Sequence, residues 1–224
     1  MNVLLSGIVG STAYGLAHAG SDIDRLGLYA APTVELHGLH RPAESHVTTA
    51  PDRTLHEAAK WCRLALGCNP TASELVWLPA DLYEVRTELG EELIALRRTF
   101  LSARAVRNSY LGYATQQFRK LSNRDRSDPQ GLDRAAKHAR HLVRLVEQGL
   151  ALHETGEVVV RLAEPERVRA LGERFARTPD DAAALLAGAE ARFDRPGVLP
   201  DAPDEAPVES WLRRVRAVHY APAE

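Results

Sequence analysis

Two aspartates separated by one residue, Asp22 and Asp24, form the pattern in this chain with the most specific chemical meaning. Side chains alternate along a β-strand, so a strand here would point both carboxylates to one face and Ile23 into the core. Carboxylate oxygens are preferred ligands of Mg²⁺ and Mn²⁺. Two such ions about 3.5 to 4 Å apart can stabilise both the attacking and the leaving oxygen of a phosphoryl transfer. The sequence therefore predicts that Asp22 and Asp24 are catalytic residues and metal ligands.

A Gly-Ser pair, Gly10 and Ser11, supplies the complementary half of such a site, with Ser11 eleven residues before Asp22. Glycine lets backbone approach a phosphate closely, and Ser11 would place free amides and a hydroxyl at the start of a helix. We expect this turn to hold a nucleoside triphosphate. The alternative is that Gly10 merely turns the chain, that Ser11 merely caps a helix, and that the aspartates are a turn or cap. The combination of both motifs favours the first interpretation.

The elements that must position these residues begin with short apolar runs broken by glycine and proline. They predict strands over residues 3–9, 23–31 and, more weakly, 45–49, with a short helix from Ser11 to Ala19 between the first two. The capping-box spacings of Thr54 with Glu57 and of Thr71 with Glu74, together with helical periodicity, then predict helices. Pro165 and Pro179 stand at helix-opening positions, and residues 195–207 form a proline-rich extended linker. The expected helices cover 55–66, 72–78, 88–97, 100–122, 132–154 and 208–219, and residues 158–162 have strand composition.

This order predicts an α+β protein in two parts. Residues 1–80 would form an α/β module and residues 81–224 a mainly helical module. A cleft between the two modules is the expected ligand site.

The formal net charge is only −2, but the charge is unevenly distributed. Between Arg97 and Arg144 there are 12 Lys/Arg against 3 Asp/Glu, a net of +9. This segment is the candidate anion-binding surface, although arginines on solvated helix faces are also common. Only three lysines stand among the 28 basic residues, Lys60, Lys120 and Lys137. Where arginine is the default cation, a retained lysine suggests a place that needs a compact ammonium, and chance is the alternative explanation.

The remaining composition bounds the class of protein. Cys62 and Cys68 are the only cysteines, and they have no zinc-like spacing, so we expect two buried thiols in a reducing compartment. No stretch reaches the roughly 18 apolar residues of a membrane span, and the N-terminus lacks the positive leader of a signal peptide. We expect a cytoplasmic protein with no membrane partner.

The motifs carry a family resemblance. Gly-Ser followed by Asp-x-Asp is similar to the signature of the DNA polymerase beta nucleotidyltransferase superfamily. A longer series of matches resembles the predicted nucleotidyltransferases of an RNA repair pathway, the RlaP group. That series comprises Gly-Ser-x-Ala-Tyr-Gly-Leu from Gly10, Ser-Asp-Ile-Asp-x-x-Gly from Ser21, Asp52, Cys68-Asn69-Pro70 with Glu74-Leu75, and Lys137 to Arg144.

The resemblance implies a polymerase beta-like fold in the first module and a third carboxylate on a strand beside the Asp-x-Asp strand. Asp52 is the candidate, as a catalytic residue and metal ligand, and Glu44 is the substitute. Asn69 and Glu74 have a simpler interpretation, as a helix opening and its cap.

Lys137, His141 and Arg144 recur with Gln148 at the spacing of one helix face. Such a basic stripe is usually a solvated outer face. The resemblance implies instead that Lys137 and Arg144 bind phosphate oxygens of the nucleotide, with His141 as an additional donor.

The leading hypothesis is a metal-dependent nucleotidyltransferase that moves a nucleoside monophosphate from a nucleoside triphosphate to a hydroxyl and releases pyrophosphate. The resemblance implies an RNA 3′ end as acceptor. Two alternatives stay open: an enzyme with a small-molecule (aminoglycoside-like) or protein acceptor, and an inactive nucleotide-binding or antitoxin-like module. The sequence leaves open which nucleotide is used and whether a template takes part.

Overall fold

The computed structural model describes residues 1–125 and 128–221. Its contacts divide the chain into two compact units. The sheet unit comprises Met1–Leu101 and Pro203–Glu224, and the helical unit comprises Ser102–Ala202. The division thus falls after Leu101, whereas the expectation from the sequence placed it near residue 80, and the last helix belongs to the sheet unit.

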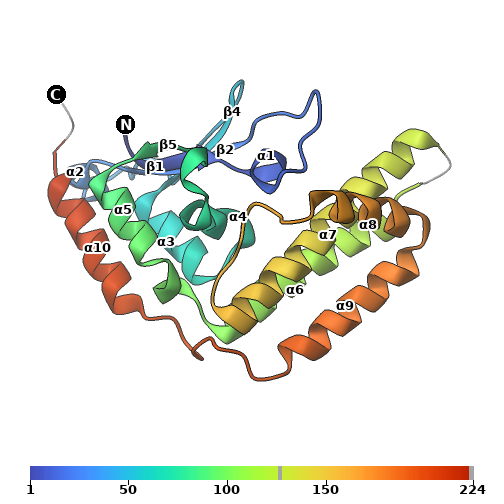
Figure 1. Cartoon of the computed structure of the whole chain (residues 1–224). Helices are drawn as coiled ribbons and strands as arrows, with labels where there is room; N and C mark the ends of the chain where they lie inside the picture. The colour runs from blue at the N-terminus through green and yellow to red at the C-terminus, as the bar shows by residue number, and fades with distance from the viewer. Residues whose placement is uncertain (126–127, 222–224) are drawn as a thin grey trace. The chain divides into compact units, whose positions relative to one another are not determined.

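A five-stranded mixed sheet forms the centre of the sheet unit, in the order β3-β4-β2-β1-β5. Figure 1 labels β1, β2, β4 and β5 of this sheet. β2 and β4 are parallel, and the other neighbouring pairs are antiparallel. The predicted α+β class is therefore confirmed. The strands are β1 (Asn2–Ile8), β2 (Arg25–Ala30), β3 (Ser45–Thr49), β4 (Asp52–Glu57) and β5 (Tyr83–Arg86).

β4 corrects one prediction, because its residues were expected to open a helix near residue 55. The backbone of β4 pairs with β3 on one side and β2 on the other, and this two-sided pairing outweighs the local capping signal. The helix begins only at Ala58, where the side chain of Glu57 accepts a hydrogen bond from the Ala59 amide at 2.8 Å. Glu57 therefore occupies the N-cap position of this helix and not the N3 position, which the glutamate of a capping box would occupy. β5 was not predicted at all.

Helices cover one face of this sheet, as Figure 1 shows for α3, α5 and α10. The buried core of this unit includes Trp61 on α3 and Leu28 on β2, and neither side chain has exposed surface. The cysteines are both buried, as expected. The helices of the sheet unit are α1 (Gly10–Tyr14), α2 (Thr33–Leu36), α3 (Ala58–Leu66), α4 (Pro70–Ser73), α5 (Glu88–Ala95) and α10 (Glu205–Val218), with 3₁₀ turns at Glu74–Trp77, Ala80–Leu82 and Arg97–Phe100.

Two polar contacts hold α10 in the sheet unit. The fully buried Trp211 donates its indole N–H to the Leu89 carbonyl at 2.8 Å. The Arg216 guanidinium forms two hydrogen bonds, of 2.6 and 3.0 Å, with the buried carboxylate of Glu57. The helix that carries Arg216, 159 residues after Glu57, thus completes the unit that contains the sheet.

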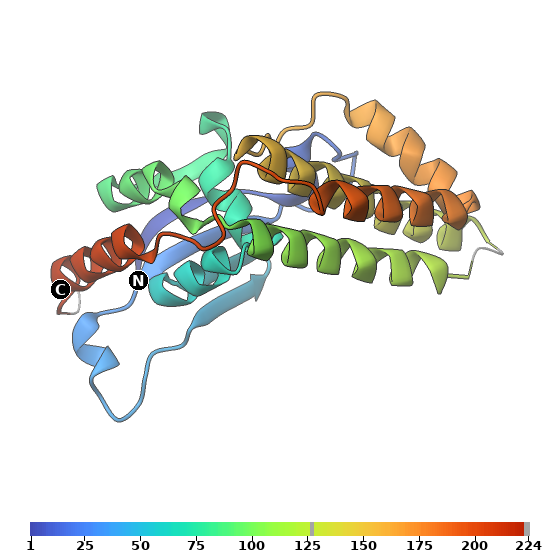
Figure 2. The same cartoon turned by 90° about the horizontal axis from the view of Figure 1, so that it is seen from below.

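The helical unit contains α6 (Ala103–Ser122), α7 (Pro129–Thr155), α8 (Pro165–Arg177) and α9 (Pro179–Phe193). The predicted long helices and both proline-opened helices are confirmed. α6 and α7 lie side by side in both views (Figures 1 and 2). Gly149 permits this approach, because a β-carbon there would lie 2.7 Å from the Cβ of Tyr110.

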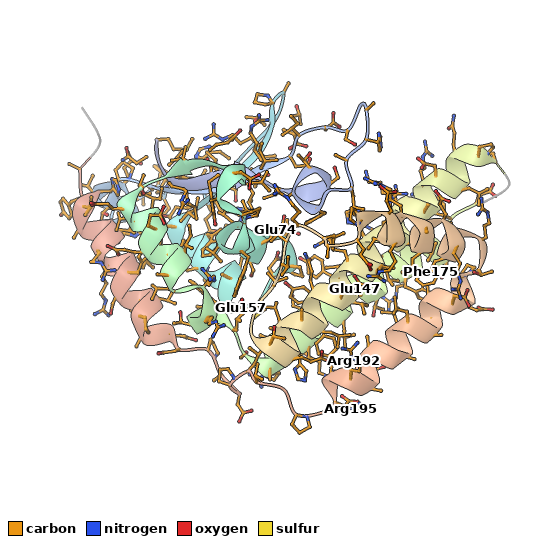
Figure 3. All side chains as sticks on the ribbon, viewed as in Figure 1. Glu74, Glu147, Glu157, Phe175, Arg192 and Arg195 are labelled. Carbon is orange, nitrogen blue, oxygen red and sulfur yellow. The ribbon has the colours of Figure 1, made fainter. Side chains whose placement is uncertain are left out.

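Ion pairs join α7 to its other neighbours in this unit. Arg167 on α8 lies 2.6 Å from Glu147 on α7, and Arg192 on α9 lies 2.7 Å from Glu154 (Figure 3 labels Glu147 and Arg192). The expected strand over residues 158–162 is wrong, since that segment forms no strand. Val158 and Val160 are buried and Val159 is exposed, as a strand would require. In the described part of the helical unit, however, no other strand is present to pair with this backbone.

No helix among the described residues combines the length and apolar character needed to cross a bilayer.

Candidate active site

The turn after β1 differs in detail from its prediction. α1 begins at Gly10, so Ser11 lies within its first turn and is not its cap; Val9 occupies the cap position without a side-chain bond. The helix ends at Tyr14 and not at Ala19, because Gly15 adopts the left-handed conformation at φ 76° and its amide bonds back into the helix. Ser11 still lies in the tight turn that joins β1 to the next segment.

Gly10 and Asp24 meet directly in the structure. Gly10 has φ +68°, and a β-carbon built on it would lie 2.2 Å from Oδ2 of Asp24 and 3.1 Å from its Cγ. The backbones are joined as well, since the Val9 amide donates to the Asp24 carbonyl at 3.0 Å. Only glycine fits both the conformation and the space. The two halves of the sequence motif therefore form one local structure.

The Asp-x-Asp segment lies just outside the strand on which it was expected. β2 begins at Arg25, Asp22 is exposed and Asp24 is half-buried. The expectation that Ile23 points into the core is wrong, because its side chain is 45 % exposed. The physical reason is that β1 ends at Ile8 and the chain turns at Gly10, which leaves Asp22 and Ile23 no extended backbone to pair with.

Asp52 begins β4, the strand beside β2. The parallel register matches Arg25 with Arg53, so Asp24 and Asp52 occupy corresponding positions one residue before that pair. Neighbouring strands are about 4.8 Å apart, and side chains at matched parallel positions share a face. Extending this register by one residue makes the backbone positions of Asp24 and Asp52 neighbours.

Glu44, the substitute candidate, lies at the other end of the β3–β4 pair. The antiparallel register sets Thr49 opposite Asp52 and Ser45 opposite His56. Glu44 precedes Ser45 and forms an ion pair with Arg63 at 2.5 Å. The length of β4 therefore separates Glu44 from Asp52.

The carboxylates of Asp22, Asp24 and Asp52 are a donor set of the hard-oxygen type that Mg²⁺ and Mn²⁺ prefer. Within residues 1–125 and 128–221, no group of three or more His, Cys, Asp or Glu side chains is already arranged around a common metal position. The strands and the Gly10 turn therefore set the backbone positions of these residues, but their side chains do not converge on a shared metal position.

A buried hydrogen bond anchors α1 behind this turn. The Tyr14 hydroxyl donates to the carboxylate of Glu74, and both side chains are only 4 % exposed. The cap of α4 is Asn69, whose Oδ1 accepts from the amides of Thr71 and Ala72 at 3.1 and 3.0 Å. The interpretation of Asn69 as a helix opening is confirmed, whereas Glu74 holds Tyr14 instead of capping a helix. The sequence signal for Tyr14 was its place in the Gly-Ser-x-Ala-Tyr stretch.

Lys137, His141 and Arg144 lie on α7 in the helical unit, at the expected helical spacing. Lys137 is exposed, but Arg144 and Gln148 are each only 5 % exposed, so this stripe is not simply a solvated face. The Arg144 guanidinium donates to the Gln148 side-chain oxygen at 2.7 Å. Burial and then the charges of Arg144 and Lys137 lower the pKa of His141 to about 3. His141 is therefore neutral at physiological pH and can donate one hydrogen bond.

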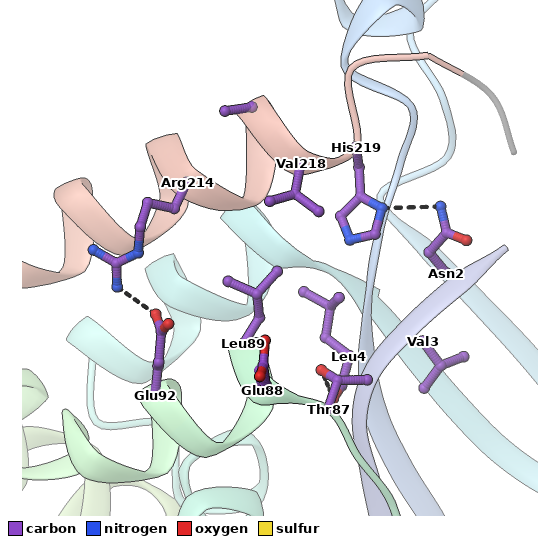
Figure 4. Close-up of a pocket in the computed structure, with 11 residues that line it drawn as sticks. Asn2, Val3, Leu4, Thr87, Glu88, Leu89, Glu92, Arg214, Val218 and His219 are labelled. Carbon is purple, nitrogen blue, oxygen red and sulfur yellow. Dashed lines mark hydrogen bonds and ion pairs between the residues drawn. The ribbon is translucent and has the colours of Figure 1, made fainter.

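A separate cavity of about 570 Å³ lies in the sheet unit at the opposite end of β1 from Gly10 (Figure 4). Its wall includes Asn2, whose amide contacts the His219 ring at 3.2 Å, and an ion pair between Arg214 and Glu92. Leu4 and Leu89 line its apolar part. None of the residues proposed for the active site lines this cavity.

The comparison with protein families supports the resemblance that the motif residues carry. A family model described as "RNA repair pathway DNA polymerase beta family", RlaP, matches residues 1–186. No match was found among curated proteins. The matched region includes the Gly10 turn, all three aspartates and α7, and it spans most of the chain. The chain therefore belongs to the RlaP family, the DNA polymerase beta family of an RNA repair pathway.

Proposed function

We propose that this protein transfers a nucleoside monophosphate from a nucleoside triphosphate to a hydroxyl group and releases pyrophosphate. Membership of a polymerase beta-like family supports a nucleotidyltransferase role. The observation that carries the finer proposal is the position of Asp24, which lies against the Gly10 turn and, like Asp52, directly precedes the first residue pair of the β2–β4 register.

In this proposal the three carboxylates, Asp22, Asp24 and Asp52, bind divalent metal ions. When bound, Mg²⁺ or Mn²⁺ would supply charge neutralisation for the phosphates and activation of the attacking hydroxyl. The chain itself contributes the positions: Asp24 is fixed by its contact with Gly10, and Asp52 by its pairing with Thr49 at the start of β4.

Gly10 and Ser11 would hold the β- and γ-phosphates of the triphosphate. The absence of a side chain at Gly10 exposes its backbone, and the Ser11 hydroxyl is a further donor. The buried Tyr14–Glu74 hydrogen bond keeps α1, and with it this turn, in one orientation.

On α7, Lys137 and Arg144 would bind phosphate oxygens and neutralise the charge of the departing pyrophosphate. His141, being neutral, would act as a donor and not as a cation. The hydrogen bond from Arg144 to Gln148 restricts the guanidinium to one orientation.

For the acceptor, we propose an RNA 3′ end. The family description and the net charge of +9 between Arg97 and Arg144 support a polyanionic acceptor. A small-molecule or protein acceptor, and an inactive nucleotide-binding module, are the competing outcomes of the test.

The test incubates the protein with each α-labelled nucleoside triphosphate, Mg²⁺ or Mn²⁺, and one acceptor: pooled RNA, a protein mixture or an aminoglycoside. We expect label on RNA with stoichiometric pyrophosphate. Label on a different acceptor would overturn the RNA assignment and keep the chemistry. Pyrophosphate and label absent from every reaction would overturn the transferase proposal.

Matched variants assign the activity to the site. Asp22→Asn and Asp24→Asn remove one negative charge each with little change of shape, and each should reduce transfer at least about 100-fold, as expected for loss of transition-state charge stabilisation. Glu35→Gln is the control, because Glu35 is exposed on α2 and its change removes the same charge elsewhere in the sheet unit.

A further inference from the structure

A serine, a histidine and a lysine form a polar cluster at the β3 edge of the sheet, apart from the residues assigned above. Ser45 on β3 and His56 on β4 are opposite each other in the antiparallel register. The Ser45 Oγ lies 2.8 Å from His56 Nδ1, and the Lys60 Nζ donates to the same Oγ at 2.8 Å. All three side chains are half-buried, so the cluster is ordered by its neighbours and still reaches solvent.

The hydrogen bonds determine what this cluster can offer to a ligand. Burial and the nearby Lys60 charge lower the pKa of His56, so its ring is neutral at physiological pH and its Nδ1 can accept the Ser45 proton. Ser45 then accepts from Lys60. The ammonium uses one of its three N–H groups in this way and keeps two donors.

Lys60 is also distinctive in its charge. Within the described residues it has no carboxylate at ion-pair distance, whereas Arg63, one turn further along α3, is paired with Glu44. Lys60 is one of three lysines in a chain with 25 arginines. An ammonium held in place by a hydroxyl but not neutralised is suited to a phosphate oxygen.

The cluster lies on the face of the sheet that carries Asp52. Side chains alternate along β4, so Asp52, Thr54 and His56 share one face. At about 3.3 Å per residue, His56 is roughly 13 Å from Asp52 along the strand. Val47, which pairs with Thr54 between them, is 66 % exposed, so this part of the face is open to solvent.

We propose that Lys60, oriented by Ser45 and His56, binds a backbone phosphate of a single-stranded RNA acceptor whose 3′ hydroxyl lies at Asp52. This inference rests on the proposed function. A stacked strand carries one phosphate per about 3.4 Å of its axis, so a separation of about 13 Å corresponds to roughly four nucleotides. The subsite would therefore select acceptors long enough to extend from Asp52 to Lys60.

The primary test measures RNA binding directly and does not need turnover. A labelled single-stranded octanucleotide is titrated with wild-type protein, Lys60→Gln and Lys60→Arg over a range of salt concentrations. We expect Lys60→Gln to weaken binding by up to about fivefold at low salt, the range of one exposed ion pair. The slope of log K against log salt should fall by about 0.7, the loss of one phosphate contact on a single strand, and Lys60→Arg should restore it.

Arg213→Gln is the matched control, because it also removes one positive charge but lies on α10, in an exposed pair with Glu209. Its slope should equal that of the wild type. Thermal unfolding of each variant confirms that Lys60→Gln is folded. An unchanged slope for folded Lys60→Gln, or an equal loss for Arg213→Gln, would overturn the subsite.

A transfer assay separates this proposal from the proposed function. With the octanucleotide as acceptor, Lys60→Gln should raise the acceptor KM and leave kcat unchanged; with a dinucleotide, which is too short to reach Lys60, it should change neither. Lys60-dependent RNA binding without any transfer would overturn the transferase proposal alone. Transfer whose acceptor KM is equally insensitive to Lys60 for both lengths would overturn the subsite alone.

Discussion

Replacing Gly10 with alanine tests whether the turn and the first aspartates form one structure. The new β-carbon would lie 2.2 Å from Asp24 Oδ2, and the residue would keep φ +68°, in the left-handed region. An L-residue in that region costs about 1 to 2 kcal/mol. Forcing a carboxylate out of a closely packed position adds about 1 to 3 kcal/mol, the usual range for overpacking.

Gly20→Ala separates the two costs. Gly20 also has positive φ, at +91°, but apart from its two chain neighbours no described residue has an atom within 4 Å of its would-be β-carbon. Gly20→Ala should therefore lose only the conformational part of the free energy of unfolding, about 1 to 2 kcal/mol. The difference between the two variants measures the contact with Asp24.

A double-mutant cycle with Asp24→Ala makes the assay decisive. Removing the carboxylate leaves only the Asp24 β-carbon, 3.3 Å from the new methyl, so Gly10→Ala should cost about 1 to 3 kcal/mol less in that background. The free energies come from urea unfolding midpoints of the four proteins. Costs that add within about 0.5 kcal/mol, with Gly10→Ala no worse than Gly20→Ala, would refute the proposed contact between turn and carboxylate.

Three further predictions concern the stability of each unit. Gly149→Ala should destabilise the helical unit by about 1 to 3 kcal/mol, because the methyl group overlaps Tyr110 of α6. Gly112→Ala, in open space on α6, should instead stabilise this unit by about 0.5 to 1 kcal/mol. Changes of the same sign in the free energy of urea unfolding would contradict this packing. Arg216→Ala should lower the stability of the sheet unit by about 3 to 5 kcal/mol, because it leaves the buried Glu57 carboxylate without its guanidinium partner. A change in thermal unfolding no larger than the loss of an exposed ion pair produces would contradict this expectation. The pKa of His141 is about 3 in the folded protein, below the ordinary 6.5, so the unfolded state binds one more proton between these values. The free energy of unfolding should therefore fall as the pH drops from about 6.5 towards 3. His141→Gln should flatten this part of the profile of urea midpoint against pH.

Local signals predicted much of this protein. Short apolar runs broken by glycine and proline located β1, β2 and β3, and prolines at the first helical position marked the starts of α8 and α9. Each of these signals acts within a few residues, because it reflects backbone conformation and hydrogen bonding inside one element. The fold class followed from their order.

β4 and Glu74 show where such signals end. The Thr54–Glu57 spacing favours a helix locally, yet pairing with two neighbouring strands makes the segment β4. Glu74 has the position of a cap in the sequence, but its carboxylate is buried against Tyr14, sixty residues earlier. Neither outcome can be derived from the segment itself, because the deciding partners come from distant parts of the chain.

Residue types and spacing alone were enough to predict the candidate site, from two aspartates separated by one residue, a Gly-Ser turn whose serine lies eleven residues before the first of them, and a resemblance to the family to which the chain belongs. The neighbours of these residues from other parts of the chain follow from the pairing of the strands. The antiparallel register of β3 and β4 sets Glu44 at the far end of β4 from Asp52 and pairs Ser45 with His56, and the side chain of Lys60 reaches Ser45 from α3. The parallel register of β2 and β4, extended by one residue, makes the backbone positions of Asp24 and Asp52 neighbours. The physical reason is that strand pairing is a long-range choice, made by the burial and hydrogen bonding of the whole sheet, whereas residue type and spacing are local.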